Sequence, residues 1–302
     1  MKLESLLNKA TQMKDQMIAV AAAADEEVLS AVEKAIEWDL GKFMLFGDEN
    51  EIQSLIRKFP LLESSTHVTI HHAESVELSA EMAVRAIHEK KAHVLMKGNI
   101  PTAKILKAVL NKEYGLRTGN VLSHVAVFEV PHYDRFIFVT DAAMNIRPNL
   151  EQKAQIIQNA VQIAKSVGID LPKVAVLAAI EQINPAMPET LDAASLTMMN
   201  ERGQIKDCLI NGPLALDNAI STFAAEQKKI KNEVAGQADI LAVPEIVTGN
   251  VLYKSLMYFA NAKVAAVISG AKAPIVLTSR ADKAESKLYS IALAICASKS
   301  QN

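Results

Sequence analysis

The sequence predicts an α/β fold built from short parallel strands that alternate with amphipathic helices. Apolar runs such as Met17–Ala21 and Lys42–Gly47 are each followed by acidic residues and then by a helical repeat of apolar positions. Strands covered by helices on both faces read as continuous apolar runs, which favours a mostly parallel sheet. Half of the 302 residues are apolar, enough to bury two hydrophobic cores.

The first part of the chain repeats a strand followed by a helix. The predicted strands are Met17–Ala21, Lys42–Gly47, His67–His72 and Ala92–Met96. The predicted helices open at Asp25 and at Asp48 or span Ser75–Glu89 and Pro101–Lys112. In the first of these helices the apolar residues Val28, Val32, Ile36 and Leu40 share one face.

The pattern changes near Val121. Two strand-like stretches, Val121–Val130 and Arg135–Thr140, follow each other so closely that a helical crossover is excluded, which predicts a hairpin. A second alternating series follows: helix Leu150–Ser166, strand Lys173–Ala179, helix Pro188–Asn200, strand Ile205–Ile210, helix Ala215–Glu226, strand Ile240–Val243, helix Val251–Phe259, strand Val264–Ser269, strand Pro274–Leu277 and helix Asp282–Ser298. We therefore expect two α/β domains.

Composition limits the classes of function. A net charge of −2 gives no global attraction for nucleic acid, although a local basic cleft could bind a small anion. Cys208 and Cys296 lie in apolar runs without metal-type spacing, which favours core residues in a reducing compartment. The charged N-terminus resembles no signal peptide, and no apolar run is long enough to predict a membrane span. We expect a cytoplasmic protein that acts on small molecules.

No metal site and no dinucleotide site is predicted. His71 and His72 point to opposite faces of a strand, and the other histidines join no cluster of Cys and carboxylates. His124 lies in an apolar strand and is predicted to be a core residue. Neither a Gly-x-Gly-x-x-Gly motif after the first strand nor a Gly-x-Ser-x-Gly motif is present.

The segment 273–285 is the strongest candidate for chemistry. A short strand delivers Thr278, Ser279 and Arg280 to the start of a helix that also carries Asp282 and Glu285. A hydroxyl, a guanidinium and carboxylates at a helix N-terminus suit a phosphate or a developing oxyanion. A helix cap followed by an acidic first turn explains these residues equally well when they are taken alone.

The turn after strand Ala92–Met96 is a second candidate, placed where open α/β sheets bind ligands. Lys97 supplies a point charge, Gly98 permits close backbone approach, and Thr102 could cap the next helix or bond a phosphate. The glycine spacing of a P-loop is absent. Lys104, Lys107 and Lys112 in the following helix favour a ligand-binding turn over a plain connection.

Three further turns follow strands of the second series. Asp141 is accompanied by Asn145 and Arg147, and a turn residue and a ligand contact are equally good interpretations. The pair Gly212-Pro213, next to Asn211, indicates a tight structural turn that could also line a site. Thr248, Gly249 and Asn250 form the last turn, in which Asn250 is expected to cap the next helix or hold a ligand.

These turns, taken in order, carry a resemblance. The motifs are VLMKGNIPTAKILKAVLN at 94–111, VLSHVAVFEVP at 121–131, FVTDAAMNI at 138–146, INGPLALDNAI at 210–220, VAGQADILAVPEI at 234–246, GNVLYKSL at 249–256 and GAKAPIVLTSRADKAESKLYSIALA at 270–294. Together they cover nearly the whole chain and resemble the phosphate acetyl/butyryltransferase family.

The resemblance implies a reversible exchange in which acyl-CoA and phosphate give acyl phosphate and free CoA. CoA would be a substrate, with no tightly bound cofactor. It also implies a fold similar to the isocitrate and isopropylmalate dehydrogenases, with the active site in a cleft between domains 1–121 plus 275–302 and 122–274. A homodimer or larger assembly is implied as well. The rivals are a phosphate acetyltransferase and a non-catalytic protein that binds CoA or acyl phosphate.

Roles follow from the resemblance residue by residue. Arg280 would stabilise the oxyanion and Ser279 would bond the sulfur. The acetyltransferases place their base aspartate where this chain has Ser286, so Glu285 or Asp282 would serve. Lys107 and Tyr258 replace acetyltransferase arginines, which points to the butyryl branch. The expected substrate contacts are Lys97, Gly98, Asn99, Thr102, Lys107, Asp141, Asn211, Gly212, Thr248, Gly249 and Asn250.

Overall fold

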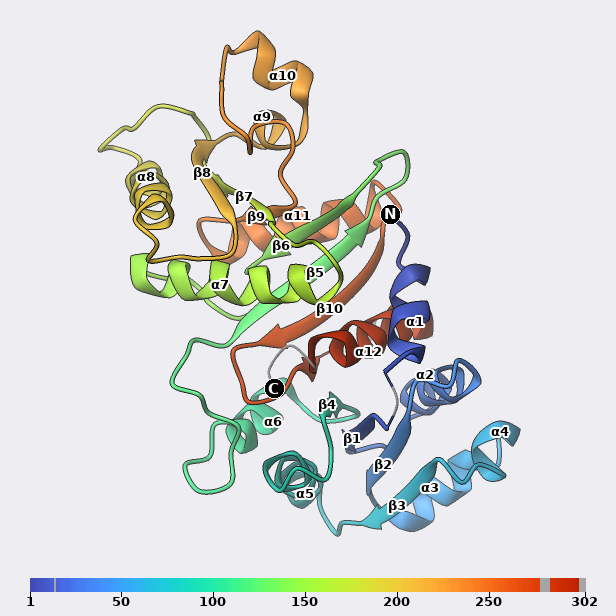
Figure 1. The fold of residues 1–302 in the computed structure, drawn as a ribbon. Coiled ribbons are helices and arrows are strands. Elements are labelled where there is room, and N and C mark those ends of the chain that lie inside the picture. Colours follow the sequence, from blue (N-terminus) through green and yellow to red (C-terminus); the bar gives the residue numbers. More distant parts are fainter. Residues whose placement is uncertain (14, 278–282, 299–302) are drawn as a thin grey trace. The chain divides into compact units, whose positions relative to one another are not determined.

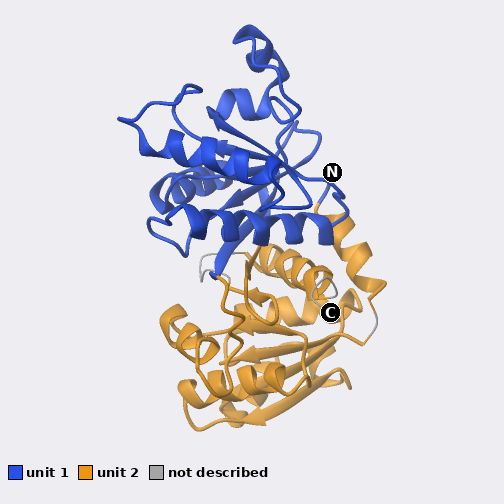
Figure 2. Cartoon of the chain, turned by 60° about the vertical axis from the view of Figure 1, so that its left-hand side comes forward, with its two compact units in different colours: residues 1–2, 121–264 blue, residues 3–120, 265–302 orange. Residues whose placement is uncertain are grey.

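The computed structural model describes residues 1–13, 15–277 and 283–298, and it confirms the α/β fold (Figure 1). The chain divides into two compact units (Figure 2). We call residues 3–120 with 265–302 the N-terminal unit, and residues 1–2 with 121–264 the central unit. The interdomain position of the active site stays a prediction.

The N-terminal unit contains a largely parallel sheet with strand order β3-β2-β1-β4-β11-β10. All neighbouring pairs from β3 to β11 are parallel, and β10 runs antiparallel to β11. The strands are β1 (Met17–Ala21), β2 (Lys42–Gly47), β3 (Val68–His72), β4 (Val94–Lys97), β10 (Lys263–Ser269) and β11 (Ile275–Val276); the first two residues of β10 belong to the central unit. The helices are α1 (Glu4–Thr11), α2 (Glu26–Glu37), α3 (Glu49–Ile56), α4 (Pro60–Glu63), α5 (Val76–His88), α6 (Thr102–Val109) and α12 (Ala284–Ser298).

Local sequence explains where the helices of this unit begin. The side chains of Asp25, Asp48 and Ser75 each accept a hydrogen bond from the backbone N–H three residues later. Each therefore satisfies one of the N–H groups that a helix start leaves without an intrahelical partner. The acidic openings read from the sequence are thus confirmed as caps.

Helix α12 is the central support of the N-terminal unit. Every residue from Lys287 to Ser298 is buried, and the helix packs against α1, α2, β4 and β11. A helix that is apolar on all sides is stable only when it is enclosed in this way. The helix that closes the sequence therefore packs beside elements that open it.

The central unit contains the strand order β5-β6-β9-β7-β8. Strands β5 (Ser123–Glu129) and β6 (Phe136–Thr140) form the predicted antiparallel hairpin, and β9 (Ile240–Ala242), β7 (Lys173–Leu177) and β8 (Leu209–Leu214) continue in parallel. The helices are α7 (Leu150–Ser166), α8 (Pro188–Glu201), α9 (Leu216–Ile220), α10 (Thr222–Gln227) and α11 (Ile246–Tyr258).

Several predicted bounds in the central unit are wrong. Strand β8 continues through the Asn-Gly-Pro segment that was expected to be a turn. The helix expected from Ala215 to Glu226 is broken, because Ser221 ends α9 and caps α10 through its hydroxyl. Helix α11 begins at Ile246 instead of Val251. In the N-terminal unit, α1 and α4 were not predicted at all.

Candidate active site

The turn after β4 is held by backbone contacts. Gly98 N–H donates to the carbonyl of Ala21 at 2.8 Å, and Asn99 N–H donates to that of Ala22 at 2.8 Å. A Cβ added at Gly98 would lie 2.2 Å from the Ala22 oxygen, so only glycine fits. Lys97 is buried, and its ammonium donates to the Gly98 carbonyl at 3.0 Å. The turn thus fixes a buried positive charge at the end of a strand.

The strand that precedes the Thr-Ser-Arg segment lies directly beside this turn. β11 runs parallel to β4, with Ile275 opposite Leu95 and Val276 opposite Met96. Both strands therefore end at the same edge of the sheet, which is the edge where parallel α/β sheets bind ligands. The candidates Ser279, Arg280 and Asp282 themselves lie outside the described residues.

Glu285, the other candidate base, lies in the first turn of α12 and is exposed. Its carboxylate accepts a hydrogen bond from the Tyr289 hydroxyl at 3.0 Å. Ser286, which occupies the place of the acetyltransferase aspartate, accepts the Ser290 hydroxyl at its backbone carbonyl. The turn of α12 nearest to residues 278–282 therefore offers one exposed carboxylate among the described residues.

The other candidates near the Lys97 turn are exposed. Asn99 and Thr102 lie on the surface, and so does Lys107 in the last turn of α6. Thr102 is not a cap, because Pro101 is the capping residue and no side chain accepts a hydrogen bond there. Of the two interpretations of Thr102, the cap is therefore wrong, and the ligand contact stays a prediction.

Asp141 is buried at the end of β6, where its carboxylate organises its own loop. One carboxylate oxygen accepts the N–H groups of Ala143 and Met144, both at 2.9 Å. The other accepts the Asn145 side chain at 2.6 Å and its backbone N–H at 3.3 Å. The Asn145 amide also donates to the Leu122 carbonyl at 2.8 Å, which ties the loop to the segment before β5. These contacts favour the structural interpretation of Asp141.

The Thr-Gly-Asn segment lies inside the first turn of α11. The cap is Glu245, whose carboxylate accepts the backbone N–H and the hydroxyl of Thr248 at 3.0 and 2.9 Å. The expectation that Asn250 caps the helix is therefore wrong. Asn250 donates to the Ala142 carbonyl at 3.3 Å, and a Cβ at Gly249 would lie 2.5 Å from the Asp141 carbonyl. The start of α11 thus packs on the Asp141 loop.

Asn211 and Gly212 lie apart from that group, on the edge strand β8. The Asn211 side chain accepts a hydrogen bond from the Asn232 amide at 3.1 Å. A Cβ at Gly212 would lie 2.8 Å from the Val176 carbonyl, so this glycine allows β8 to approach β7. The structure brings Asp141, Gly249 and Asn250 together, but places Asn211 and Gly212 across β9 and β7 from them.

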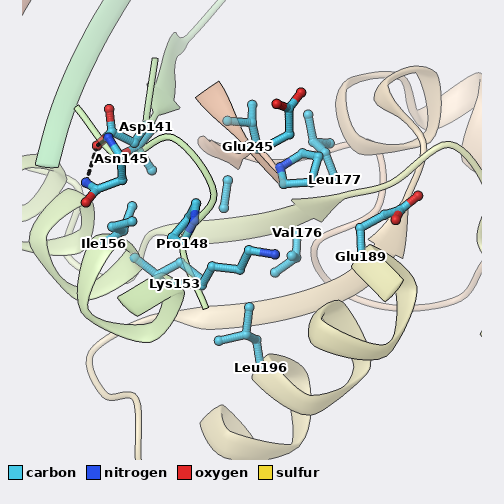
Figure 3. Close-up of a pocket in the computed structure, with 15 residues that line it drawn as sticks. Asp141, Asn145, Pro148, Lys153, Ile156, Val176, Leu177, Glu189, Leu196 and Glu245 are labelled. Atoms are coloured by element: carbon cyan, nitrogen blue, oxygen red, sulfur yellow. Dashed lines mark hydrogen bonds between the residues drawn. The ribbon is translucent and has the colours of Figure 1, made fainter. Parts of the chain in front are cut away.

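The interior beside the Asp141 loop is too full for a substrate. Asp141, Asn145, Lys153, Glu189 and Glu245 line a space of about 10 Å³ at the ends of β6, β7 and β9 (Figure 3). A single water molecule requires about as much. Lys153, which the sequence analysis did not single out, is half-buried, and its ammonium pairs with the Asp192 carboxylate at 2.7 Å. This polar cluster supports the loops above it.

A larger concavity lies over the start of α11. Its volume is about 680 Å³, within the range of small-molecule sites. Most of the lining is apolar, with Thr248, Ser255 and Glu189 among the polar contributors; the apolar lining includes Leu177, Leu216, Pro244, Val247, Val251 and Leu252. Thr248 is the predicted substrate contact of the central unit that lines this concavity.

The cysteines have the core positions that the sequence predicts. Both are buried, and burial raises the pKa of the Cys208 thiol to about 12 and that of Cys296 to about 11. His124 is also buried, as expected. Within residues 1–13, 15–277 and 283–298, no group of His, Cys and carboxylates could hold a metal ion. The same residues contain no helix long and apolar enough to cross a membrane.

Comparison with known proteins decides the family. The family model described as "Phosphate acetyl/butaryl transferase" matches residues 55–295. The chain belongs to this family. It contains the Lys97 turn, the Asp141 loop and the Thr248-Gly249-Asn250 segment within the matched range.

Two curated relatives resemble the chain over nearly its full length. The "Probable phosphate butyryltransferase" of Bacillus subtilis is 58% identical over 299 residues, which cover 99% of each chain. The "Phosphate butyryltransferase" of Clostridium acetobutylicum is 48% identical over 286 residues, covering 95% of this chain and 94% of the relative. Both relatives are acyltransferases by name, which agrees with the enzyme class implied by the resemblance.

Two solved structures support the fold. A branched-chain phosphotransacylase from Enterococcus faecalis matches with a TM-score of 0.82 and 35% identity, covering 94% of this chain and 99% of the other. A putative 4-hydroxythreonine-4-phosphate dehydrogenase from Salmonella typhimurium matches with a TM-score of 0.58 and 14% identity, covering 94% and 100%. The second likeness concerns fold alone, and it agrees with the predicted similarity to dehydrogenases.

Proposed function

We propose that this protein is a phosphate butyryltransferase that converts butanoyl-CoA and inorganic phosphate into butanoyl phosphate and CoA. A phosphate oxygen attacks the thioester carbonyl, the new C–O bond forms, and the C–S bond breaks from the tetrahedral intermediate. The departing sulfur takes a proton and leaves as the CoA thiol. The reverse reaction follows the same path. Other short or branched acyl-CoAs are expected substrates as well.

The near full-length identity to phosphate butyryltransferases carries this proposal. The geometry at the end of β4 supports it, because the reaction needs a cation where phosphate binds. Lys97 is such a cation, buried beside the strand that leads to Ser279 and Arg280. Buried charges act more strongly on an anion than exposed ones, since water screens them less.

The catalytic roles are proposed on the family resemblance. Arg280 stabilises the oxyanion and the phosphoryl oxygens, and Ser279 bonds the sulfur. Glu285 or Asp282 takes the proton of the CoA thiol when the reaction runs toward acyl-CoA. The exposure of Glu285 at the start of α12 leaves its carboxylate accessible to a substrate. Both cysteines are buried thiols, which favours direct transfer without an acyl-enzyme.

The remaining predicted residues are proposed to bind or to shape the substrate site. Lys97, Gly98, Asn99, Thr102 and Lys107 would contact the phosphate and CoA from the N-terminal unit. Thr248 and Asn250 would contact substrate from the start of α11, where Thr248 lines the apolar concavity. Asp141, Asn211, Gly212 and Gly249 would instead shape the site by fixing the backbone conformation of the loops and strands that carry these contacts.

We also propose that the protein forms a homodimer or larger assembly in the cytoplasm. Gly249 is the one fully buried residue of α11, although most of that helix is apolar. Val247, Val251, Tyr258 and the following Phe259 are exposed. An apolar helix is normally covered on all sides. Sedimentation of wild type and of Phe259→Glu tests this, and a monomeric wild type contradicts it.

The function is tested by CoA release from an acyl-CoA panel with and without phosphate. We expect turnover to require phosphate and kcat/KM to be higher for butanoyl- and isobutanoyl-CoA than for acetyl-CoA. Preference for acetyl-CoA would favour the phosphate acetyltransferase alternative. Hydrolysis independent of phosphate would exclude a phosphate acyltransferase. Binding of CoA without any turnover would favour the non-catalytic alternative.

The role of Arg280 has its own test. Arg280→Ala should lower kcat by roughly 10²-fold or more, the usual effect of losing one donor to an oxyanion. Arg57→Ala, at the end of α3 in the same unit, is the matched control and should keep the wild-type rate. A near-normal rate for Arg280→Ala would remove this residue from the chemistry.

A further inference from the structure

A second buried lysine lies in the N-terminal unit, and none of the residue roles above uses it. Lys287 belongs to α12, one turn after the helix begins, and only 3% of its surface is exposed. Its ammonium lies 3.8 Å from a carboxylate oxygen of Glu27, whose own side chain is 63% exposed. Lysines are rarely enclosed this completely.

The position of Lys287 is costly for stability. Removing an ammonium from water is unfavourable, and a helix start favours negative rather than positive charge. Two explanations are open on these grounds. The ammonium could fasten α12 to the first turn of α2 through Glu27, or its charge could serve an anionic ligand. The place of Lys287 in the fold favours the second explanation.

That place is the edge of the sheet where β4 and β11 end. β11 lies parallel to β4, and α12 packs on both strands. The first turn of α2, which carries Glu27, follows β1 at the same edge because β1 is parallel to β4. Lys97 ends β4 there. Two buried lysines therefore belong to one strand-end edge, where a bound phosphate dianion would be attracted by both charges.

We propose that Lys287 is a second phosphate-binding residue, which acts with Lys97 to hold inorganic phosphate and the phosphoryl group of the acyl phosphate. This inference rests on the proposed function in naming the acyl phosphate. The binding of inorganic phosphate by the protein does not depend on it.

The test compares Lys287→Met, Lys287→Gln and Lys287→Arg in the full chain. In Lys287→Met and Lys287→Gln, KM for phosphate should rise by roughly tenfold or more, the effect of losing one charged hydrogen bond. KM for acyl-CoA should change little. Lys287→Arg should regain most of the phosphate affinity, since it keeps the charge.

Two control variants separate the explanations. Glu27→Gln removes the carboxylate next to Lys287 and should leave KM for phosphate unchanged. Lys283→Met removes an exposed lysine one turn earlier and should also behave like wild type. Overturning results are an unchanged KM for phosphate in both uncharged variants, or an equal rise in Glu27→Gln. Failure of both uncharged variants to fold while Lys287→Arg has wild-type kinetics would likewise assign a structural role.

A second measurement keeps this inference distinct from the proposed function. Inorganic phosphate alone should raise the Tm of wild type, because a ligand that binds only the folded state stabilises it. That shift should be smaller in Lys287→Met and Lys287→Gln at equal phosphate concentration. If wild type turned over no acyl-CoA, the proposed function would fail, but a lost phosphate shift would still support the lysine site. An equal shift in wild type and both variants would overturn it.

Discussion

The two strand-end turns at Lys97 and Asp141 resemble each other in sequence position but are stabilised differently. In the N-terminal unit, backbone hydrogen bonds and the close packing of Gly98 hold the turn, with one further bond from the Lys97 ammonium to the Gly98 carbonyl. In the central unit, the Asp141 carboxylate accepts four hydrogen bonds from its own loop and from Asn145. The charge of Asp141 is thus used within its own loop, whereas we propose that the charge of Lys97 binds a ligand.

The difference has a functional consequence. Backbone hydrogen bonds supply most of the contacts of the first turn, and the Lys97 ammonium adds one bond, to the Gly98 carbonyl. The charge of Asp141 is required for its loop, and that loop supports the start of α11 through Gly249 and Asn250. We therefore expect substitutions at the first turn to separate activity from stability, and substitutions at the second to change stability first.

Gly98→Ala should have the largest effect. Its Cβ would lie within 2.2 Å of the Ala22 carbonyl oxygen, so the turn must open. We expect a loss of about 3 kcal/mol in the free energy of unfolding, at the upper end for overpacking, together with most of the activity. Urea denaturation measures the loss. Asn99→Ala, at the exposed next position, should change stability by less than about 0.5 kcal/mol. Equal stability of the two variants would refute backbone packing as the cause.

Lys97→Met should come next and should act mainly on catalysis. The charge and its bond to the Gly98 carbonyl are lost while the backbone contacts remain, so kcat/KM should fall by about 10²-fold, equivalent to about 2.7 kcal/mol. The free energy of unfolding should change by less than about 1 kcal/mol, because the lost hydrogen bond and the removal of a buried ammonium have opposite effects. Lys104→Met, in the following helix, is the exposed control. If Lys97→Met lost stability but kept the wild-type rate, Lys97 would hold the turn and would not take part in catalysis.

Asp141→Ala should destabilise the protein by about 2 kcal/mol, because it leaves N–H groups of the loop without their acceptor. Asp141→Asn keeps one acceptor oxygen and should lose about half as much. Chemical denaturation gives both values, and kcat/KM should fall less than in Lys97→Met. A stable Asp141→Ala variant with strongly reduced turnover would instead make Asp141 part of the chemistry.

Glu245→Ala should have the smallest effect, about 1 kcal/mol, the usual cost of losing a helix cap. Hydrogen bonds from the hydroxyl and backbone of Thr248 lower the pKa of the Glu245 carboxyl below its usual 4.5. The folded state therefore binds the proton less readily than the unfolded state. The cap contribution is present above pH 4.5 and disappears as the pH falls through the lowered pKa.

The pH dependence gives a check on this assignment. The stability difference between wild type and Glu245→Ala should be constant near neutral pH and should shrink in acid. Denaturation curves at several pH values between 7 and about 3.5 measure it. A difference that grew in acid would mean that Glu245 stabilises the protein in some other way.

Sequence predicted the elements whose ends are set by local chemistry. Strands β1 and β2 and helix α7 have the predicted bounds. For α7 the reason is a reciprocal cap, in which Asn149 and Gln152 each bond the other's backbone N–H. Where such a signal lies within a few residues, nothing distant is needed to place the boundary.

The predicted ends of helices and strands were wrong where tertiary packing overrode the usual preference of a residue for a cap or a turn. Asn250 is a better cap by preference than Glu245, but Gly249 must pack on the Asp141 loop, which places the earlier turn inside α11. The sequence predicted a turn at Gly212, but this residue lies within β8. A glycine is needed there because a Cβ would clash with Val176 of the neighbouring strand. These contacts join segments far apart in the chain, so no local pattern contains them.

The sequence by itself determined the fold class, the family and the candidate residues, because apolar periodicity and short motifs are local properties of the chain. Tertiary structure decided which charges are enclosed. It buried Lys97 and Lys287 in one unit, and it used the carboxylate of Asp141 to hold a loop. Burial and hydrogen-bond partners depend on which distant segments meet. No local pattern in the sequence contains this information.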